Sequence, residues 1–112
     1  SRYRVGAALA TPDGRVFIGC NVENAAYPSG TCAEAGAIAA MVAGGGREIA
    51  DILVVGDGPE LITPCGNCRQ RIREFASAST RVHAGGAEGV QRSFTLDELL
   101  PVSFGPGHLP AQ

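Results

Sequence analysis

The sequence predicts an α/β fold in which helices cover both faces of a central sheet. Strand-like and helix-like runs alternate along the chain, with no internal repeat and no domain boundary, so residues 1–112 are expected to form a single domain. Residues 49–56 form a continuous apolar run of strand length, a pattern typical of a strand buried on both faces. The 112 residues are 45% hydrophobic, which agrees with one globular core.

A β-hairpin is expected near the start of the chain. Residues 4–10 predict a buried strand, Thr11–Gly14 have the proline and glycine of a turn, and residues 16–22 predict the returning strand. Asn21 and Glu23 lie two residues apart near the end of that strand, so both side chains share one face. From the pattern alone, that polar face is either a solvent-facing edge or part of a binding site.

Two helices are expected to follow. Thr31 is suited to cap a helix over Cys32–Ala43, which is apolar nearly all round and should therefore be buried. Pro64 stands near the start of a second helix, in which Cys68, Ile72 and Phe75 share one apolar face. The arginines of this second helix are expected on its solvated side.

The last third of the chain is expected to be less regular. Residues 81–84 and 90–95 predict short, weak strands. Thr95 and Glu98 have the spacing of a capping box at the start of a helical turn. Residues 105–112 contain two prolines and two glycines and are expected to form a loose tail.

Composition excludes several classes of protein. The formal charge is −2 and the nine basic residues are scattered, which argues against a nucleic-acid partner. No run is long and apolar enough for a membrane span, and no signal-peptide pattern is present. Four cysteines could form two disulfides in a secreted protein, but their spacing favours metal chemistry in a reducing cytoplasm. Because the chain opens at Ser1 without methionine, an N-terminal piece is expected to be missing.

Three cysteines stand where helices should begin. Cys65 and Cys68 have the C-x-x-C spacing of metal or redox sites, and Cys32 supplies a third sulfur from the other helix start. Helix N-termini favour thiolates, and three thiolates leave a tetrahedral zinc ion with one open position, the arrangement of catalytic sites. Cys20 could close the site as a fourth ligand, but its apolar neighbours favour a buried free cysteine.

Glu34 is the candidate acid/base beside this metal site. It follows Cys32 by two residues, near enough to reach a water on the ion without ligating it. Burial would raise the affinity of its carboxylate for protons, so that it could accept a proton and pass it on. The alternative is a surface glutamate that merely stabilises a helix N-terminus.

These residues also carry a family resemblance. Cys32-Ala33-Glu34 followed by Pro64-Cys65-Gly66-Asn67-Cys68-Arg69-Gln70 resembles the signature of zinc-dependent cytidine deaminases. The runs 3–9, 19–27 and 99–104 look like the small homotetrameric class, so the resemblance covers nearly the whole chain. It implies a three-layer α/β/α sandwich with a mixed central sheet, preceded in the family by a helix before Tyr3.

The resemblance also implies a reaction and a set of roles. In the implied reaction, zinc-bound hydroxide attacks C4 of cytidine or deoxycytidine, Glu34 shuttles the protons, and uridine or deoxyuridine is left, as in pyrimidine salvage. The ligands of one zinc ion per subunit would be Cys32, Cys65 and Cys68. The remaining implied site residues bind substrate or meet a neighbouring subunit of a homotetramer: Asn21 and Glu23 at the ribose, Tyr3 at the pyrimidine ring, and Ala33, Tyr27 and Phe104 around the pocket.

One position departs from the family pattern. Many relatives carry arginine directly after the glutamate, where this chain has Ala35, so the helix N-termini, with Arg69 or Gln70, are expected to offset the thiolate charge. Two alternatives stay open at this point. One is a deaminase of a modified cytosine nucleoside such as blasticidin S, and the other is a non-enzymatic zinc-stabilised or thiol redox domain.

Overall fold

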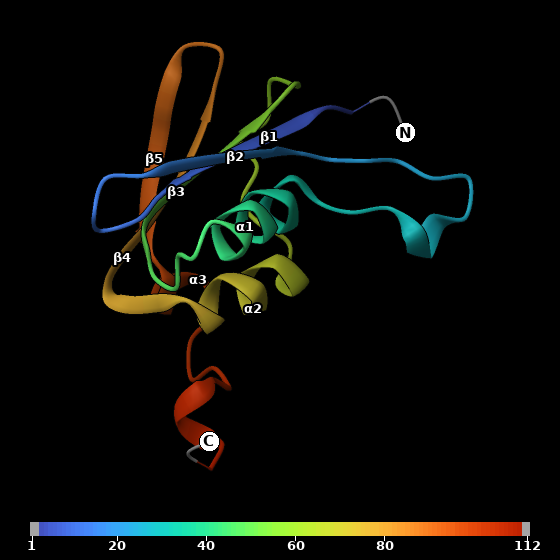
Figure 1. The fold of residues 1–112 in the computed structure, drawn as a ribbon. Coiled ribbons are helices and arrows are strands. Elements are labelled where there is room, and N and C mark those ends of the chain that lie inside the picture. Colours follow the sequence, from blue (N-terminus) through green and yellow to red (C-terminus); the bar gives the residue numbers. More distant parts are fainter. Residues whose placement is uncertain (1–2, 111–112) are drawn as a thin grey trace.

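The computed structural model describes residues 3–110 as one five-stranded sheet with three α-helices (Figure 1). The strands lie in the order β2-β1-β3-β4-β5 across the sheet. The elements are β1 (Val5–Ala10), β2 (Val16–Cys20), α1 (Ala33–Ala43), β3 (Ile49–Gly56), α2 (Gly66–Glu74), β4 (Ala76–Gly86), β5 (Gly89–Thr95) and α3 (Leu96–Leu99), with single 3-10 turns at Tyr27–Ser29 and Pro106–His108.

The sheet is mixed, as expected. Strand β1 runs antiparallel to both β2 and β3, β3 runs parallel to β4, and β4 runs antiparallel to β5. The single parallel pair needs a crossover connection, which α2 provides between β3 and β4. The expected hairpin is present, and Gly14 in its turn has φ +88°, a conformation that favours glycine.

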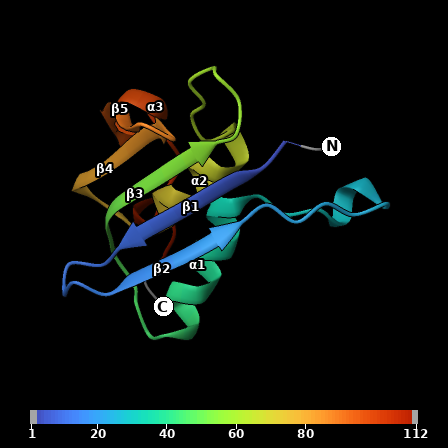
Figure 2. The ribbon, with the colours of Figure 1, turned by 90° about the horizontal axis from the view of Figure 1, so that it is seen from above.

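Helices α1 and α2 lie on the same face of the sheet (Figure 2). On that face Leu9, Ile52 and Val82 are at most 1% exposed and pack with Met41 and Ile72 of the helices. Within residues 3–110 the helices therefore cover one face of the sheet, whereas the sequence predicted helices on both faces. The core lies between the sheet and these helices, because alternate residues of each strand point toward the helices.

The opposite face of the sheet is exposed at β2, so the expectation that Cys20 is buried is wrong. Val16 and Ile18 of β2 are 65% and 73% exposed, and Cys20 at the end of the same face is exposed rather than buried. Apolar neighbours in sequence did not bury Cys20, because β2 is an edge strand whose outer face no described helix covers. Helix α1 is likewise buried on one side only, and its Val42 is 36% exposed.

Several boundaries also differ from expectation. The N-cap of α1 is Cys32 rather than Thr31, whereas α2 begins beside Pro64 as expected, with Cys65 as its N-cap. Strand β4 is eleven residues long rather than short, since it lies between β3 and β5 and pairs with both. The capping box of α3 is present as expected, with Thr95 Oγ1 accepting from the Glu98 N–H at 3.2 Å.

The C-terminal segment projects away from the sheet and helices (Figure 1). The Phe104 ring stacks on His108, with centroids 5.3 Å apart, and the Gln70 side chain donates to the Phe104 carbonyl at 2.8 Å. Residues 106–108 of the tail, which we expected to be loose, form the second 3-10 turn. In the described part of the chain, no helix has the length and apolar character of a membrane span.

Candidate metal centre and active site

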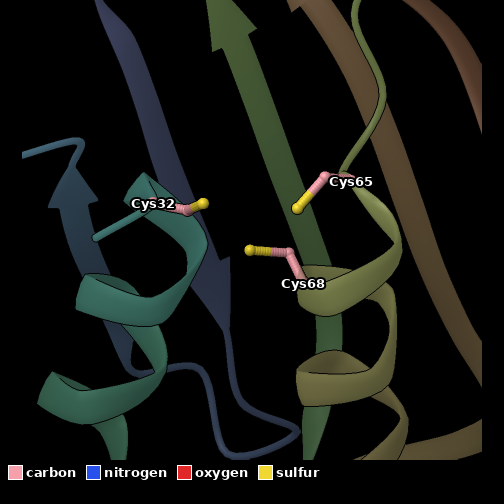
Figure 3. A group of neighbouring side chains, drawn as sticks. All are labelled: Cys32, Cys65 and Cys68. Carbon is pink, nitrogen blue, oxygen red and sulfur yellow. The ribbon is translucent and has the colours of Figure 1, made fainter. Parts of the chain in front are cut away.

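Three thiols converge where α1 and α2 begin (Figure 3). Cys32 and Cys65 are the N-caps of these helices, and Cys68 lies in the first turn of α2. Their Sγ atoms all lie within 4.8 Å of one another. Sulfur ligands of a tetrahedral zinc ion lie about 3.8 Å apart, given Zn–S bonds of about 2.3 Å. The donor set and its spacing therefore fit zinc. Among the described residues, Cys20 does not join this group, so three protein ligands leave a position open.

The three thiols are not equivalent electrostatically. The pKa of Cys65 is lowered, chiefly by the backbone N–H of Cys68 and further by the side chains of Cys68 and Cys32. Burial raises the pKa of Cys68 to about 12, and the negative charge of Glu34 adds to that rise. Cys68 is fully buried, so its thiolate has little access to water. A bound cation is what would draw the proton off this thiol.

Glu34 lies beside the cluster and outside it. It is in the first turn of α1 and only 4% exposed, although it is a charged residue type. Burial raises the pKa of its carboxyl, while a hydrogen bond to its own backbone and the charge of Arg71 act in the opposite direction. The expected rise in its proton affinity is confirmed, and desolvation is the main cause.

The arginines of α2 at positions 69, 71 and 73, which were expected on a solvated helix face, are half-buried and not fully solvated. Arg71 donates from Nη1 to the Sγ of Cys68 at 3.4 Å. Arg69 instead donates to the carbonyls of Pro64 and Leu99, both at 2.7 Å, and to the Thr63 hydroxyl at 2.8 Å.

The side chain that reaches a sulfur is not one of the two expected from the sequence. Neither Arg69 nor Gln70 bonds to a thiol, and the residue that does, Arg71, was not proposed for the site. The signal that could have found it is spacing: Arg71 is three residues beyond Cys68, and side chains at that offset share a helix face.

A cavity of about 440 Å³ opens beside the cluster. Its volume is within the range of small-molecule sites. The site residues expected from the sequence that line it are Tyr3, Asn21, Glu23, Tyr27, Cys32, Ala33, Glu34 and Cys65. Cys68 is buried behind this lining, and Phe104 is not among the lining residues of its own chain.

Asn21 has a defined position at the mouth of this cavity. Its Oδ1 accepts from the Val5 N–H at 3.0 Å, and its Nδ2 donates to the Tyr3 carbonyl at 2.9 Å. The same Nδ2 donates to Glu23 Oε1 at 3.3 Å. Because the amide is tied to the backbone on one side and to Glu23 on the other, it holds the carboxylate next to the cavity.

Comparison with known proteins agrees with this geometry. Residues 1–84 match the family described as the cytidine and deoxycytidylate deaminase zinc-binding region. The chain belongs to the cytidine deaminase family. A cytidine deaminase of Halalkalibacterium halodurans is 42% identical over 104 residues, which cover 93% of this chain and 79% of that protein. A cytidine deaminase of Mycobacterium tuberculosis is 41% identical over 113 residues, covering 100% of this chain and 80% of the relative.

Solved cytidine deaminases also share the fold. The crystal structure of the Burkholderia pseudomallei cytidine deaminase superposes with a TM-score of 0.85 at 43% identity, covering 92% of this chain and 83% of that one. A Mycobacterium tuberculosis cytidine deaminase structure superposes with a TM-score of 0.78 at 35% identity, covering 94% and 81%. The expected family, its zinc-binding character and the α/β fold with a mixed sheet are therefore confirmed.

Proposed function

We propose that this member of the cytidine deaminase family hydrolyses cytidine and deoxycytidine to uridine and deoxyuridine, releasing ammonia, in pyrimidine salvage. One observation carries the proposal: a buried glutamate, Glu34, lies in a nucleoside-sized cavity beside three thiols that fit a zinc ion. A purely structural zinc site has no use for a buried carboxylate at an open position, which disfavours the non-enzymatic alternative.

Glu34 is proposed to move the protons of the reaction. Zinc held by Cys32, Cys65 and Cys68 would supply a Lewis acid that lowers the pKa of a water molecule from about 15.7 toward 7. Glu34 accepts a proton from the attacking water and delivers it to N3 of the cytosine ring. It then takes the proton of the new C4 hydroxyl and passes it to the C4 amino group, which leaves as ammonia, so that a C4 carbonyl and an N3–H remain. The raised pKa of the buried carboxyl suits a group that must both take and return protons.

The rest of the cavity is proposed to orient the nucleoside. The Glu23 carboxylate accepts a hydrogen bond from the ribose 3′-hydroxyl, and the Asn21 amide both holds Glu23 and faces the same hydroxyl. The Tyr3 ring packs on the pyrimidine. Ala33, which is fully buried at the start of α1, closes the cavity with a methyl group and leaves room for the base.

We also propose that the active form is a homotetramer in which neighbouring subunits complete each site. Two aromatic residues support this. Tyr27 belongs to the 3-10 turn Tyr27–Ser29, on an arm that projects from the body of the chain (Figure 1). The exposed fractions of Tyr27 and Phe104 are 89% and 58%, and Phe104 lies outside the cavity of its own chain. Large exposed aromatics are typical of interaction surfaces. Sedimentation of the wild-type chain and of a Phe104→Ala variant measures the oligomeric state directly. A wild-type monomer with full activity would contradict it.

The proposed location is the cytoplasm. All four cysteines are free, and the three at the cavity must remain thiolates to hold a metal ion. An oxidising compartment would favour disulfides between such closely spaced sulfurs.

Turnover of cytidine tests the function. We expect the zinc-loaded protein to remove the cytosine absorbance of cytidine and deoxycytidine, and to leave blasticidin S unchanged. A Glu34→Gln variant should bind zinc normally and lose about 10²–10⁴-fold in rate, the usual contribution of an acid/base group. Zinc bound at one ion per chain without turnover of any cytosine nucleoside would refute the proposal.

A further inference from the structure

Charge balance at the three-sulfur site requires a cation that the sequence pattern did not identify. Three thiolates around a divalent ion leave a net charge of −1, and the residue after Glu34 is the uncharged Ala35. Excess negative charge at a buried site is unfavourable unless it is paired. The N-termini of α1 and α2 contribute only partial charges.

Arg71 is the arginine of α2 that reaches a sulfur. Its Nη1 donates to the Cys68 Sγ at 3.4 Å, and the Cys68 side chain is fully buried. The neighbouring arginines are engaged elsewhere: Arg69 holds backbone carbonyls and Thr63, and Arg73 donates to the Ser103 hydroxyl at 3.0 Å. Among the described residues of this helix, the position of Arg71 is therefore distinctive.

We infer that Arg71 is a positioning residue of the metal centre, which holds the Cys68 sulfur as a ligand and offsets the surplus negative charge of the three-thiolate site. The inference rests on the zinc site of the proposed function. Arg71 of α2 thereby supplies the positive charge that the uncharged Ala35 of α1 cannot supply.

The physical basis is the cost of a buried thiolate. Cys68 lies where water cannot solvate its anion, and a hydrogen bond from a permanent cation is the strongest compensation available there. Conversely, the thiols raise the pKa of Arg71, first through the hydrogen bond to Cys68 and then through their charges. Arg71 also acts on Glu34, whose carboxyl feels its positive charge.

Zinc affinity, measured without any nucleoside, tests the inference. In competition with a chromophoric chelator at one fixed pH, Arg71→Met should bind zinc about 10–100-fold more weakly than wild type, as is usual for residues that support metal ligands. Arg73→Met is the matched control, because it removes the same group from the same helix without touching a sulfur, and its affinity should be unchanged. An Arg71→Met affinity within twofold of wild type, or an equal loss in Arg73→Met, would overturn the inference.

Cobalt substitution gives a second readout. Loss of the hydrogen bond raises the energy of the sulfur lone pair, so the thiolate-to-cobalt charge-transfer band of Arg71→Met should move to longer wavelength, while that of Arg73→Met stays in place. If Arg71→Met fails to fold, the comparison of Arg71→Lys with Arg71→Gln replaces it. Lysine should retain more affinity than glutamine, and equal affinities would refute a role for charge.

These outcomes are independent of the reaction. A wild-type protein without cytidine turnover would refute the proposed function and leave the metal-binding result intact. Unchanged metal binding in Arg71→Met beside normal turnover would refute the inference alone.

Discussion

Gly19 of β2 packs directly against Ala33 at the start of α1. A Cβ atom added at Gly19 would overlap the Ala33 carbonyl oxygen and the Ala37 amide nitrogen, so that strand and helix backbones meet with no side chain between them. Gly36 on the helix completes this close approach from the other side. The contact sets the position of the first turn of α1, which carries Glu34 and follows Cys32.

Gly19→Ala should therefore damage both stability and the metal centre. We expect the free energy of unfolding in urea to fall by about 1–3 kcal/mol, the usual cost of overpacking, and zinc affinity to fall because Cys32 is displaced. Gly6→Ala is the control, since a Cβ at Gly6 meets nothing within 4 Å. Equal stability of the two variants would show that the sheet can yield at Gly19.

Arg69 should act as a clamp for the loop that leads into Cys65. Its guanidinium joins Thr63, Pro64 and Leu99, so Arg69→Ala leaves several acceptors without a donor, and we expect a loss of about 2 kcal/mol in the free energy of unfolding. Arg69→Lys should not restore it, because an ammonium group cannot bridge acceptors arranged for a planar fork. Urea denaturation of both variants measures this, and full rescue by lysine would contradict the clamp.

Zinc affinity should rise steeply with pH. Thiols must lose their protons to ligate a metal, and the pKa of Cys68 in the metal-free protein is about 12, so this thiol is protonated throughout the neutral range. Each ion therefore displaces at least one proton, and the dissociation constant should fall at least about tenfold per pH unit between pH 6 and 8. Chelator competition at several pH values provides the measurement. An affinity independent of pH would show that Cys68 is already a thiolate before metal binds.

The capping box of α3 should contribute stability that depends on pH. Hydrogen bonds from the backbone N–H and the hydroxyl of Thr95 lower the pKa of Glu98 below its ordinary value of 4.5. A depressed carboxyl pKa stabilises the fold above the unfolded value and loses that effect as pH falls through the folded value. Wild type should thus be more stable than Glu98→Gln at pH 7, and the difference should begin to shrink near pH 4.5 and disappear as the pH falls below the lowered pKa of folded Glu98. Urea denaturation at pH 7 and at a series of pH values below 4.5 checks it, and a constant difference would assign the effect to geometry rather than charge.

The residues of the candidate site were largely predictable because their signals are local. The C-x-x-C spacing of Cys65 and Cys68 places both sulfurs at one helix start, and Glu34 follows Cys32 closely enough to share its helical turn. The Thr95 capping box is likewise a pattern of four consecutive residues, and the structure contains it. That Cys32 meets Cys65 and Cys68 is a tertiary contact between the starts of α1 and α2, and the sequence predicted it only from the shared chemistry of the three thiols.

Other features depended on which surfaces meet in the folded chain. Cys20 has apolar neighbours in sequence, yet it is exposed because β2 is an edge strand. Strand β4 extends beyond the predicted residues 81–84, and its first residue, Ala76, pairs with Ile49 of β3, a contact that local sequence does not show.

The chain's own pattern thus determined the alternation of strands and helices, the helix-start positions of the three cysteines and the place of Glu34 close to Cys32, since each is encoded over a few residues. Only the tertiary structure decided that Arg71 turns to a sulfur while Arg69 turns to Pro64 and Leu99. A long arginine side chain can reach many acceptors. Which acceptor it contacts depends on the residues, distant in sequence, that packing places beside its guanidinium group.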